Sequence, residues 1–283
     1  MSTDESAGVV RPAGEPWGSL EHLRAEREPG GRDGVVLVTL DLAGRRNAMT
    51  EQMTRSWHEV MRSLQDDTSV RAVVVTGSGS AFCAGGDFSW LGATPDADVP
   101  ALRERMMAFY RAWLSVLDVR APVVAAVNGA AIGAGLAVAL ACDVRVAADD
   151  ARLAAPFTSL GLHPGMATTA LLRRAAGDTL ARDMLLTGRA LRGSEAVTSG
   201  LMSRSVPRGQ VLDTALDVAA EVAAAAPVAT ALTKSSLGSG GPATVAQALE
   251  WEGLAQPVTL AMDDLVEGLA AARERRTPQF RSR

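Results

Sequence analysis

The stretch NGAAIGAGLAVALACD, from Asn128 to Asp143, is a glycine-spaced turn that leads into a nearly all-apolar segment. It follows PVVAAV, an apolar run typical of a buried strand. Glycine at these spacings lets one backbone approach another closely. The stretch has no Lys, His, Ser or Glu, so a ligand here would be held by backbone groups. Because Asn128 and three glycines interrupt the apolar run, it predicts strand, turn and helix rather than a membrane span.

Strand and helix patterns alternate along the chain. The apolar runs 34–42, 71–77, 122–129 and 143–148 lack the alternation of a half-exposed strand. Apolar residues at helical spacing predict one helix after Thr50, its expected N-cap, and another from Leu102 to Leu117. These helices are expected to bury the large side chains Met53, Trp57, Met106 and Trp113. The pattern predicts an α/β protein whose parallel strands are covered on both faces.

Three parts of the chain differ in composition. Residues 1–16 are rich in Ser, Gly, Pro and acidic residues, which predicts a disordered leader. Residues 17–206 hold the strand patterns and both glycine-rich turns, which predicts the ligand-binding core. Residues 207–283 have no strand pattern and predict three helices, at 209–227, 227–238 and 243–276, that form an oligomerisation region.

Composition excludes several classes of protein. The 283 residues have a net charge of −4 and no basic excess, which argues against a nucleic-acid partner. The N-terminus has no basic segment of a signal peptide, and no run reads as a membrane anchor, so we expect a cytoplasmic protein. Cys83 and Cys142 are expected to be reduced core thiols. The three histidines and two cysteines show no metal-ligand spacing, so no metal is predicted.

Two glycine-rich turns, Gly77 to Asp87 and Gly129 to Gly135, each follow an apolar strand. Neither has the GK[ST] sequence of a P-loop, and the second has the wrong spacing for a dinucleotide-binding fingerprint. Two interpretations remain open. The turns can each direct one backbone N–H at a single oxygen, which makes an oxyanion hole. Alternatively, their small residues only allow tight packing of strand on helix.

The chain resembles the crotonase (enoyl-CoA hydratase/isomerase) superfamily from about residue 20 onwards. The matching pieces, in order, are RRNAMT (45–50), AFCAGGD (81–87), PVVAAVNGAAIGAG (122–135), ACDVRVAADDARLAAP (141–156), LGLHPG (160–165), LLTGRALRGSEAVTSGLMSRSVP (185–207) and RTPQFRSR at the end. The resemblance implies a spiral of ββα units, a C-terminal helical trimerisation region, and a homotrimer or a dimer of trimers. It also implies an acyl-CoA ligand of fatty acid metabolism, with coenzyme A as the thioester part of the substrate and no separate cofactor.

The resemblance also assigns residues to the site. Gly86 in CAGGD and Ala134 in IGAG match the two positions whose amides bind the thioester oxygen. The positions that match the coenzyme A contacts of the family are Arg45, Arg46, Ala48, Ala84 near the adenine, and Phe280 and Arg283 at the C-terminus, often reaching a neighbouring subunit.

Both hydratase glutamate positions depart from the family pattern. The first, on the helix after the second turn, is Ala137, and the second, after a proline, is Phe157. Hydration needs an acid and a base around one water, and neither side chain moves a proton. Simple two-glutamate hydration is therefore disfavoured, and so is the isomerisation that uses a carboxylate at the second position.

His163 is the best remaining candidate for acid/base work, because its ordinary pKa suits that role and it lies near Gly165, where some relatives place a carboxylate. Alternatively it caps or packs against the next helix. Asp87 is more often a loop anchor than a catalyst at such a position. Thr158 and Ser159 are weaker candidates for positioning a water, and Asp143 is expected to be structural.

Two functions fit these residues. The first is a lyase- or isomerase-type enzyme that stabilises a thioester enolate by a route other than two-glutamate hydration. The second is an acyl-CoA carrier that kept the pocket and lost the catalyst, with Ala137 and Phe157 forming an apolar tunnel. A purely structural subunit has little support, because it has no need of both glycine turns.

Overall fold

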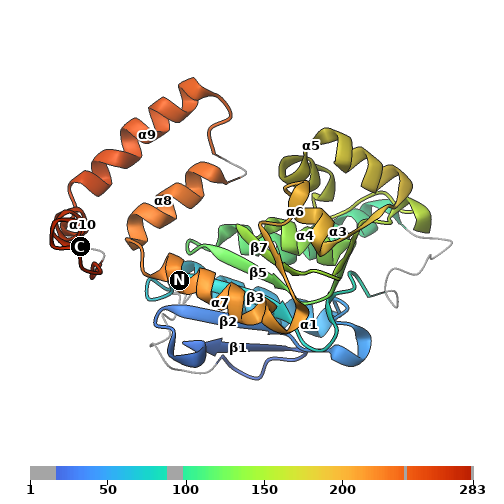
Figure 1. The fold of residues 1–283 in the computed structure, drawn as a ribbon. Coiled ribbons are helices and arrows are strands. Elements are labelled where there is room, and N and C mark those ends of the chain that lie inside the picture. The colour runs from blue at the N-terminus through green and yellow to red at the C-terminus, as the bar shows by residue number, and fades with distance from the viewer. Residues whose placement is uncertain (1–16, 88–97, 239–240, 282–283) are drawn as a thin grey trace, which may run out of the picture.

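The computed structural model describes residues 17–87, 98–238 and 241–281. The predicted leader, residues 1–16, lies outside this range, as does Arg283. Figure 1 shows helices α3 to α6 at the upper right, beside strands β5 and β7, and helices α8 to α10 extending away at the upper left.

The larger sheet has six strands in the order β1-β2-β3-β5-β7-β10. They are β1 (Leu23–Arg27), β2 (Val35–Leu40), β3 (Ala72–Gly77), β5 (Val123–Val127), β7 (Val144–Ala148) and β10 (Arg204–Val206). Neighbours from β2 to β10 pair in parallel, as predicted, whereas β1 pairs antiparallel with β2. Every residue of β2, β3 and β5 is buried, which explains the absence of alternation in their sequences.

A second sheet follows the order β4-β6-β8-β9, with parallel pairs except for β8 and β9. Its strands are β4 (Ala81–Cys83), β6 (Ala130–Ile132), β8 (Arg152–Ala154) and β9 (Ala190–Arg192). The sequence patterns missed this sheet. Each glycine-rich turn carries the chain from a strand of the first sheet to a strand of the second.

The helices are α1 (Glu51–Asp66), α3 (Val99–Leu114), α4 (Ala134–Ala141), α5 (Thr168–Thr187), α6 (Gly193–Thr198), α7 (Val211–Ala223), α8 (Pro227–Leu237), α9 (Val245–Leu260) and α10 (Asp263–Glu274). Thr50 caps α1 as predicted, because its hydroxyl accepts a hydrogen bond from the Met53 amide at 3.1 Å. Helix α7 packs along β2, β3, β5 and β7. The helices that stand apart from the sheets therefore begin with α8.

The tryptophan pair Trp57 and Trp113 joins α1 to α3. Both residues are fully buried, and their rings stack with centroids 4.9 Å apart. The Trp57 indole donates to the Trp113 carbonyl at 3.2 Å, and the Trp113 indole donates to the Thr54 hydroxyl at 2.9 Å. The pair satisfies its polar atoms inside the core, as buried tryptophans require.

Two expectations for the helices were wrong. Met106 was expected in the core but is only half-buried, because the outer part of α3, where Leu102 is exposed, does not face the core. The predicted third C-terminal helix is two helices, α9 and α10. Pro257 provides no amide to the last turns of α9, and Asp263 and Asp264 favour a new helix N-terminus.

Candidate functional site

The two glycine-rich turns lie side by side. Strands β4 and β6, which lie within these turns, pair in parallel with Ala81 opposite Ala130. A Cβ placed on Gly135 would lie 2.3 Å from the carbonyl oxygen of Cys83, and one on Gly129 would lie 2.0 Å from that of Ser80. Backbone therefore touches backbone at both ends of this pair, and a side chain has no room there.

The amides of Gly86 and Ala134 are close together. A Cβ on Gly85 would lie 3.5 Å from the Ala134 nitrogen and 2.7 Å from the Ile132 carbonyl oxygen. The Gly86 nitrogen is three covalent bonds from that Cβ position, so the Gly86 and Ala134 nitrogens are at most about 7 Å apart. Ala134 is the first residue of α4, where an amide has no acceptor within the helix.

Two asparagines hold the first turn. Asn47 is fully buried, and its amide group donates to the carbonyls of Ser78 and Ala81, both at 2.9 Å. Asn128 donates to the Gly77 carbonyl at 2.8 Å and accepts from the Gly77 amide at 3.2 Å. The first turn is therefore fastened both to the loop before α1 and to the end of β5.

Arg208 joins the two turns from outside. Its guanidinium donates to the carbonyl of Ser80 in the first turn at 3.0 Å, and to the carbonyl of Asn128, directly before the second turn, at 2.7 Å. It also pairs with Asp150 at 2.9 Å. This residue was not predicted, because a single arginine after a proline carries no local signal of such a contact.

Four of the positions predicted to contact coenzyme A lie close together in the structure. They are Arg45, Arg46, Ala48 and Ala84. The Ala84 amide donates to the Arg46 carbonyl at 2.9 Å. Arg45 is about half exposed and pairs at 2.7 Å with the buried carboxylate of Asp87, so Asp87 does anchor this loop. Arg46 and Asn47 have φ of 51° and 56°, a left-handed conformation that is uncommon for residues with side chains. Ala48 lies next to them and is half-buried.

Phe280 lies far from the turns of its own chain. Its carbonyl accepts from Arg71 at 3.0 Å, and Arg71 precedes β3, whereas the first turn follows that strand. Six residues of strand separate these ends by about 20 Å. Contact between Phe280 and a ligand at these turns would therefore come from a different subunit, and this role stays a prediction.

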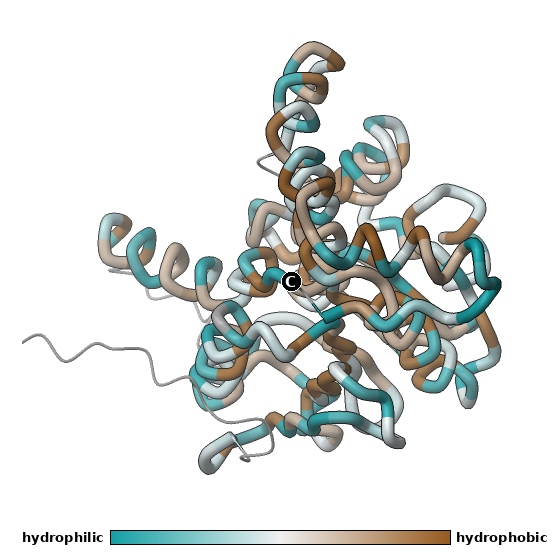
Figure 2. The backbone as a smooth tube through the Cα atoms, turned by 90° about the vertical axis from the view of Figure 1, so that its left-hand side faces the viewer, coloured by the Kyte–Doolittle hydropathy of each residue, from teal (hydrophilic) through white to brown (hydrophobic). Residues whose placement is uncertain are grey.

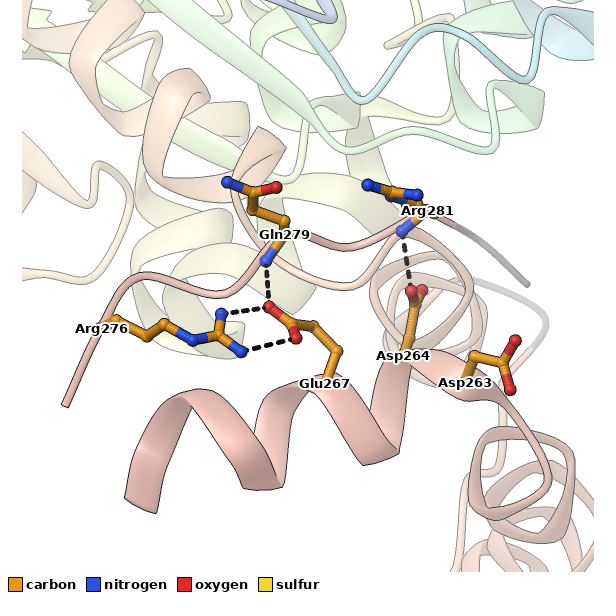
Figure 3. A pocket seen from close by; sticks show the side chains of 6 residues that line it. All are labelled: Asp263, Asp264, Glu267, Arg276, Gln279 and Arg281. Atoms are coloured by element: carbon orange, nitrogen blue, oxygen red, sulfur yellow. Dashed lines mark hydrogen bonds and ion pairs between the residues drawn. The ribbon is translucent and has the colours of Figure 1, made fainter. Parts of the chain in front are cut away.

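An open pocket in the C-terminal region is shown in Figure 3. Glu267 of α10 accepts from the Arg276 guanidinium at 2.6 and 2.8 Å and from the Gln279 amide at 2.7 Å. Arg276 lowers the pKa of Glu267 to about 2. The Arg281 amide donates to Asp264 at 2.8 Å. These hydrogen bonds hold residues 276–281 against α10. The polar residues that line the pocket are therefore explained by the packing of the C-terminal segment.

The two positions matched to glutamates are apolar and differ in exposure. Ala137 is fully buried in α4. Phe157 is half-buried, and its ring lies 3.5 Å from where a Cβ on Gly133 would be. Gly133 is the N-cap of α4, so a phenyl ring covers the start of that helix.

His163 lies on the exposed loop before α5. Its Nδ1 donates to the neighbouring Pro164 carbonyl at 2.8 Å. The Thr158 hydroxyl donates to the Leu185 carbonyl at 3.1 Å, and Ser159 packs near Gly188, so both of these serve local structure. An acid/base role for His163 stays a prediction.

Tyr110 was not predicted as a site residue. It belongs to α3, and its hydroxyl oxygen lies 2.4 Å from where a Cβ on Gly165 would be. Its only signal in the sequence is that a lone tyrosine follows Phe109 within the apolar pattern of this helix.

The cysteines are core thiols, as predicted. Cys83 and Cys142 are buried, and desolvation raises the pKa of each to about 12, so neither is a thiolate at neutral pH. No cluster of three or more His, Cys, Asp or Glu side chains suited to a metal occurs within the described ranges. No single helix of the described chain is long and apolar enough to cross a membrane, although the bent pair of 208–223 and 227–237 passes that test jointly.

Comparison with known proteins extends over almost the whole chain. A family described as enoyl-CoA hydratase/isomerase matches residues 30–283. The human enoyl-CoA hydratase domain-containing protein 2, mitochondrial, is 32% identical over 272 residues, covering 94% of this chain and 91% of the human protein. An enoyl-CoA hydratase structure from Bacillus anthracis has a TM-score of 0.86 and 28% identity, covering 93% of this chain and 100% of that one. An enoyl-CoA hydratase structure from Mycobacterium smegmatis has a TM-score of 0.82 and 30% identity, covering 92% of this chain and 99% of that one.

Proposed function

The chain belongs to the enoyl-CoA hydratase/isomerase family and has its crotonase-like fold, and we propose that it is an enzyme that processes acyl-CoA. In this proposal the amides of Gly86 and Ala134 donate hydrogen bonds to the thioester oxygen. When the α-carbon gains electron density, that oxygen becomes an enolate oxygen and both bonds strengthen. Fixed donors of this kind are each worth about 3–4 kcal/mol of barrier.

One observation carries the proposal: Gly85, which precedes Gly86, lies beside the Ala134 amide, because a Cβ placed on Gly85 would be 3.5 Å from the Ala134 nitrogen. The upper bound of about 7 Å is compatible with a single oxygen between the two amides, which requires their nitrogens to lie within about 6 Å of each other because each N–H···O bond spans about 2.9 Å. Tight packing alone explains the glycines. It does not explain why two strand ends place amides, one of them at a helix N-terminus, at this spacing.

The reaction is not simple hydration. Ala137 has only a buried methyl group, and Phe157 places a ring beside the start of α4. Neither holds or delivers a proton to water. Reactions that place negative charge on the thioester oxygen without two carboxylates remain. Decarboxylation, carbon–carbon cleavage and isomerisation with a different base do so through an enolate, and thioester hydrolysis does so through a tetrahedral oxyanion.

The alternative is a non-catalytic acyl-CoA carrier. The same two apolar positions favour it, because a methyl group and a phenyl ring bind an acyl chain without acting on it.

We expect the protein to bind CoA thioesters more tightly than free coenzyme A, and to turn over at least one thioester of a panel of enoyl-, malonyl- and β-ketoacyl-CoAs. Binding is followed by calorimetry and turnover by chromatography of the products. Tight binding with no turnover of any thioester would contradict the enzyme and support the non-catalytic acyl-CoA carrier. Hydration of crotonyl-CoA at an ordinary hydratase rate would overturn the assignment of Ala137 and Phe157 to the glutamate positions.

We further propose that helices α8 to α10 form the interface of a homotrimer, or of a dimer of trimers. Figure 2 shows apolar residues along these helices, which stand apart from the sheets in Figure 1. The large apolar side chains exposed there include Leu237, Val245, Leu249, Leu254, Val258, Leu260, Val266 and Leu269. An apolar surface of this extent is typical of an interface.

The assembly is expected to have three or six times the mass of the 29.4 kDa chain in light scattering after gel filtration. Leu254→Glu, which puts a charge on a side chain that is 73% exposed in the single chain, is expected to dissociate it. Leu186→Glu is the matched control, because Leu186 is 70% exposed on α5, away from these helices. A monomeric wild type, or equal effects of both variants, would contradict this interface.

A further inference from the structure

The hydroxyl of Tyr110 occupies the space in which a side chain at position 165 would lie. Its oxygen is 2.4 Å, and its ring carbon Cζ 2.9 Å, from the Cβ position of Gly165. Tyr110 is the single tyrosine of the chain and is only half-buried, so it is neither sealed in the core nor free on the surface. Glycine at 165 leaves room for the hydroxyl.

The loop that Tyr110 faces runs back to the second glycine turn. The Leu162 amide donates to the Phe157 carbonyl at 2.9 Å, which draws the loop into a compact turn. The Phe157 ring at its start lies against Gly133, the N-cap of α4. Helix α3, which carries Tyr110, also packs on α4. The hydroxyl thus belongs to the wall formed by α3, α4 and this loop.

The chemistry of this hydroxyl is that of a neutral donor. Burial raises the pKa of Tyr110, so the phenol keeps its proton at neutral pH. Its neighbours include the Phe109 ring, whose centroid is 6.2 Å away. Among residues 17–87, 98–238 and 241–281, no group forms a hydrogen bond with the hydroxyl. Because the hydroxyl is only half-buried, a bound ligand that brings an oxygen can accept its hydrogen bond in place of water.

We propose that Tyr110 contacts the acyl group and donates a hydrogen bond to an oxygen on it, so that the site selects acyl-CoAs with a keto or carboxyl oxygen over plain alkyl chains. The inference rests on the proposed binding of the thioester at Gly86 and Ala134. It adds the class of acyl group, which the backbone amides do not determine. The opposite interpretation, in which Tyr110 only packs against Gly165, predicts no such preference.

Acetoacetyl-CoA and butyryl-CoA test the proposal, because they share a four-carbon chain and differ by one keto oxygen. We expect the wild-type protein to bind acetoacetyl-CoA roughly tenfold more tightly than butyryl-CoA in calorimetry. Tyr110→Phe, which removes only the hydroxyl, is expected to abolish this preference and leave the affinity for butyryl-CoA unchanged. A preference that survives in Tyr110→Phe overturns the proposal.

Gly165→Ala provides a second variant that does not alter the tyrosine. Its methyl group would displace the hydroxyl, so we expect the same loss of preference. Gly209→Ala is the matched control, because a Cβ there meets nothing within 4 Å. His163→Gln tests the competing donor on the same loop. Loss of preference in His163→Gln but not in Tyr110→Phe assigns the contact to the histidine and overturns the proposal.

The outcome separates this inference from the proposed function. If neither thioester binds more tightly than free coenzyme A, the proposed function fails and the inference fails with it. If both bind with equal affinity in the wild type and in Tyr110→Phe, the inference alone fails. Melting temperatures of the variants within about 2 °C of the wild type exclude misfolding as the cause.

Discussion

Replacement of Ala134 by proline is expected to lower kcat by roughly 10²- to 10³-fold, because it removes one of the two donors to the thioester oxygen. Proline has no amide N–H, and Ala134 is the first residue of α4, the helix position that tolerates proline best. Gly85, with no side chain, leaves space beside this nitrogen. The measurement is the steady-state rate with the thioester that the wild type consumes fastest.

Ala134→Gly is the control for Ala134→Pro, because it changes the side chain and keeps the N–H. Its kcat is expected to stay within about threefold of the wild type, since a buried methyl group makes a small contribution. If Ala134→Pro folds normally and retains more than a tenth of the wild-type kcat, the Ala134 amide is not a donor in the reaction. If both variants lose activity equally, the loss comes from packing.

Gly129→Ala is expected to lower the free energy of unfolding by about 2–3 kcal/mol. The added Cβ would lie 2.0 Å from the Ser80 carbonyl oxygen and 2.8 Å from the Arg208 guanidinium, so the strand pair β4–β6 has to move apart. The corresponding fall in melting temperature is roughly 3–5 °C for a chain of this length. Chemical denaturation and calorimetry measure the two quantities.

Gly209→Ala again provides the comparison, because that glycine has open space around it and neither glycine has a positive φ. It is expected to leave stability unchanged or slightly raised, since alanine restricts the unfolded chain. Equal stability of the two variants would show that the turns are looser than the contact at Gly129 implies.

The larger sheet was predictable because its strands are fully buried. Val73, Val74 and Val75 face apolar neighbours on both sides, so their sequence is an unbroken apolar run. The second sheet was not predictable in this way. Its strands have three residues each, which is too short for any periodicity to show. Strand β1 was also missed. It exposes alternate residues to solvent, and its charged side chains make its sequence resemble that of a loop.

The close packing of the two glycine-rich turns could be predicted because backbone geometry constrains the residue type there. Gly129 and Gly135 lie where any side chain would collide with a carbonyl oxygen. The glycines in the sequence therefore indicate that the two turns approach each other closely. Tyr110 and Arg208 act across long sequence separations, 55 residues to Gly165 and 128 to Ser80. Nothing near either residue in the sequence indicates the partner, so only the fold reveals these contacts.

Arg208 has a consequence for how the site moves. The Arg208 guanidinium donates hydrogen bonds to Ser80, Asn128 and Asp150, so one side chain links three segments that are distant in sequence. These acceptors lie near solvent, and water can replace the guanidinium at small cost in folding free energy. We expect Arg208 to restrict the motion of the two turns relative to each other, because its guanidinium bonds to Ser80 and to Asn128 at the same time.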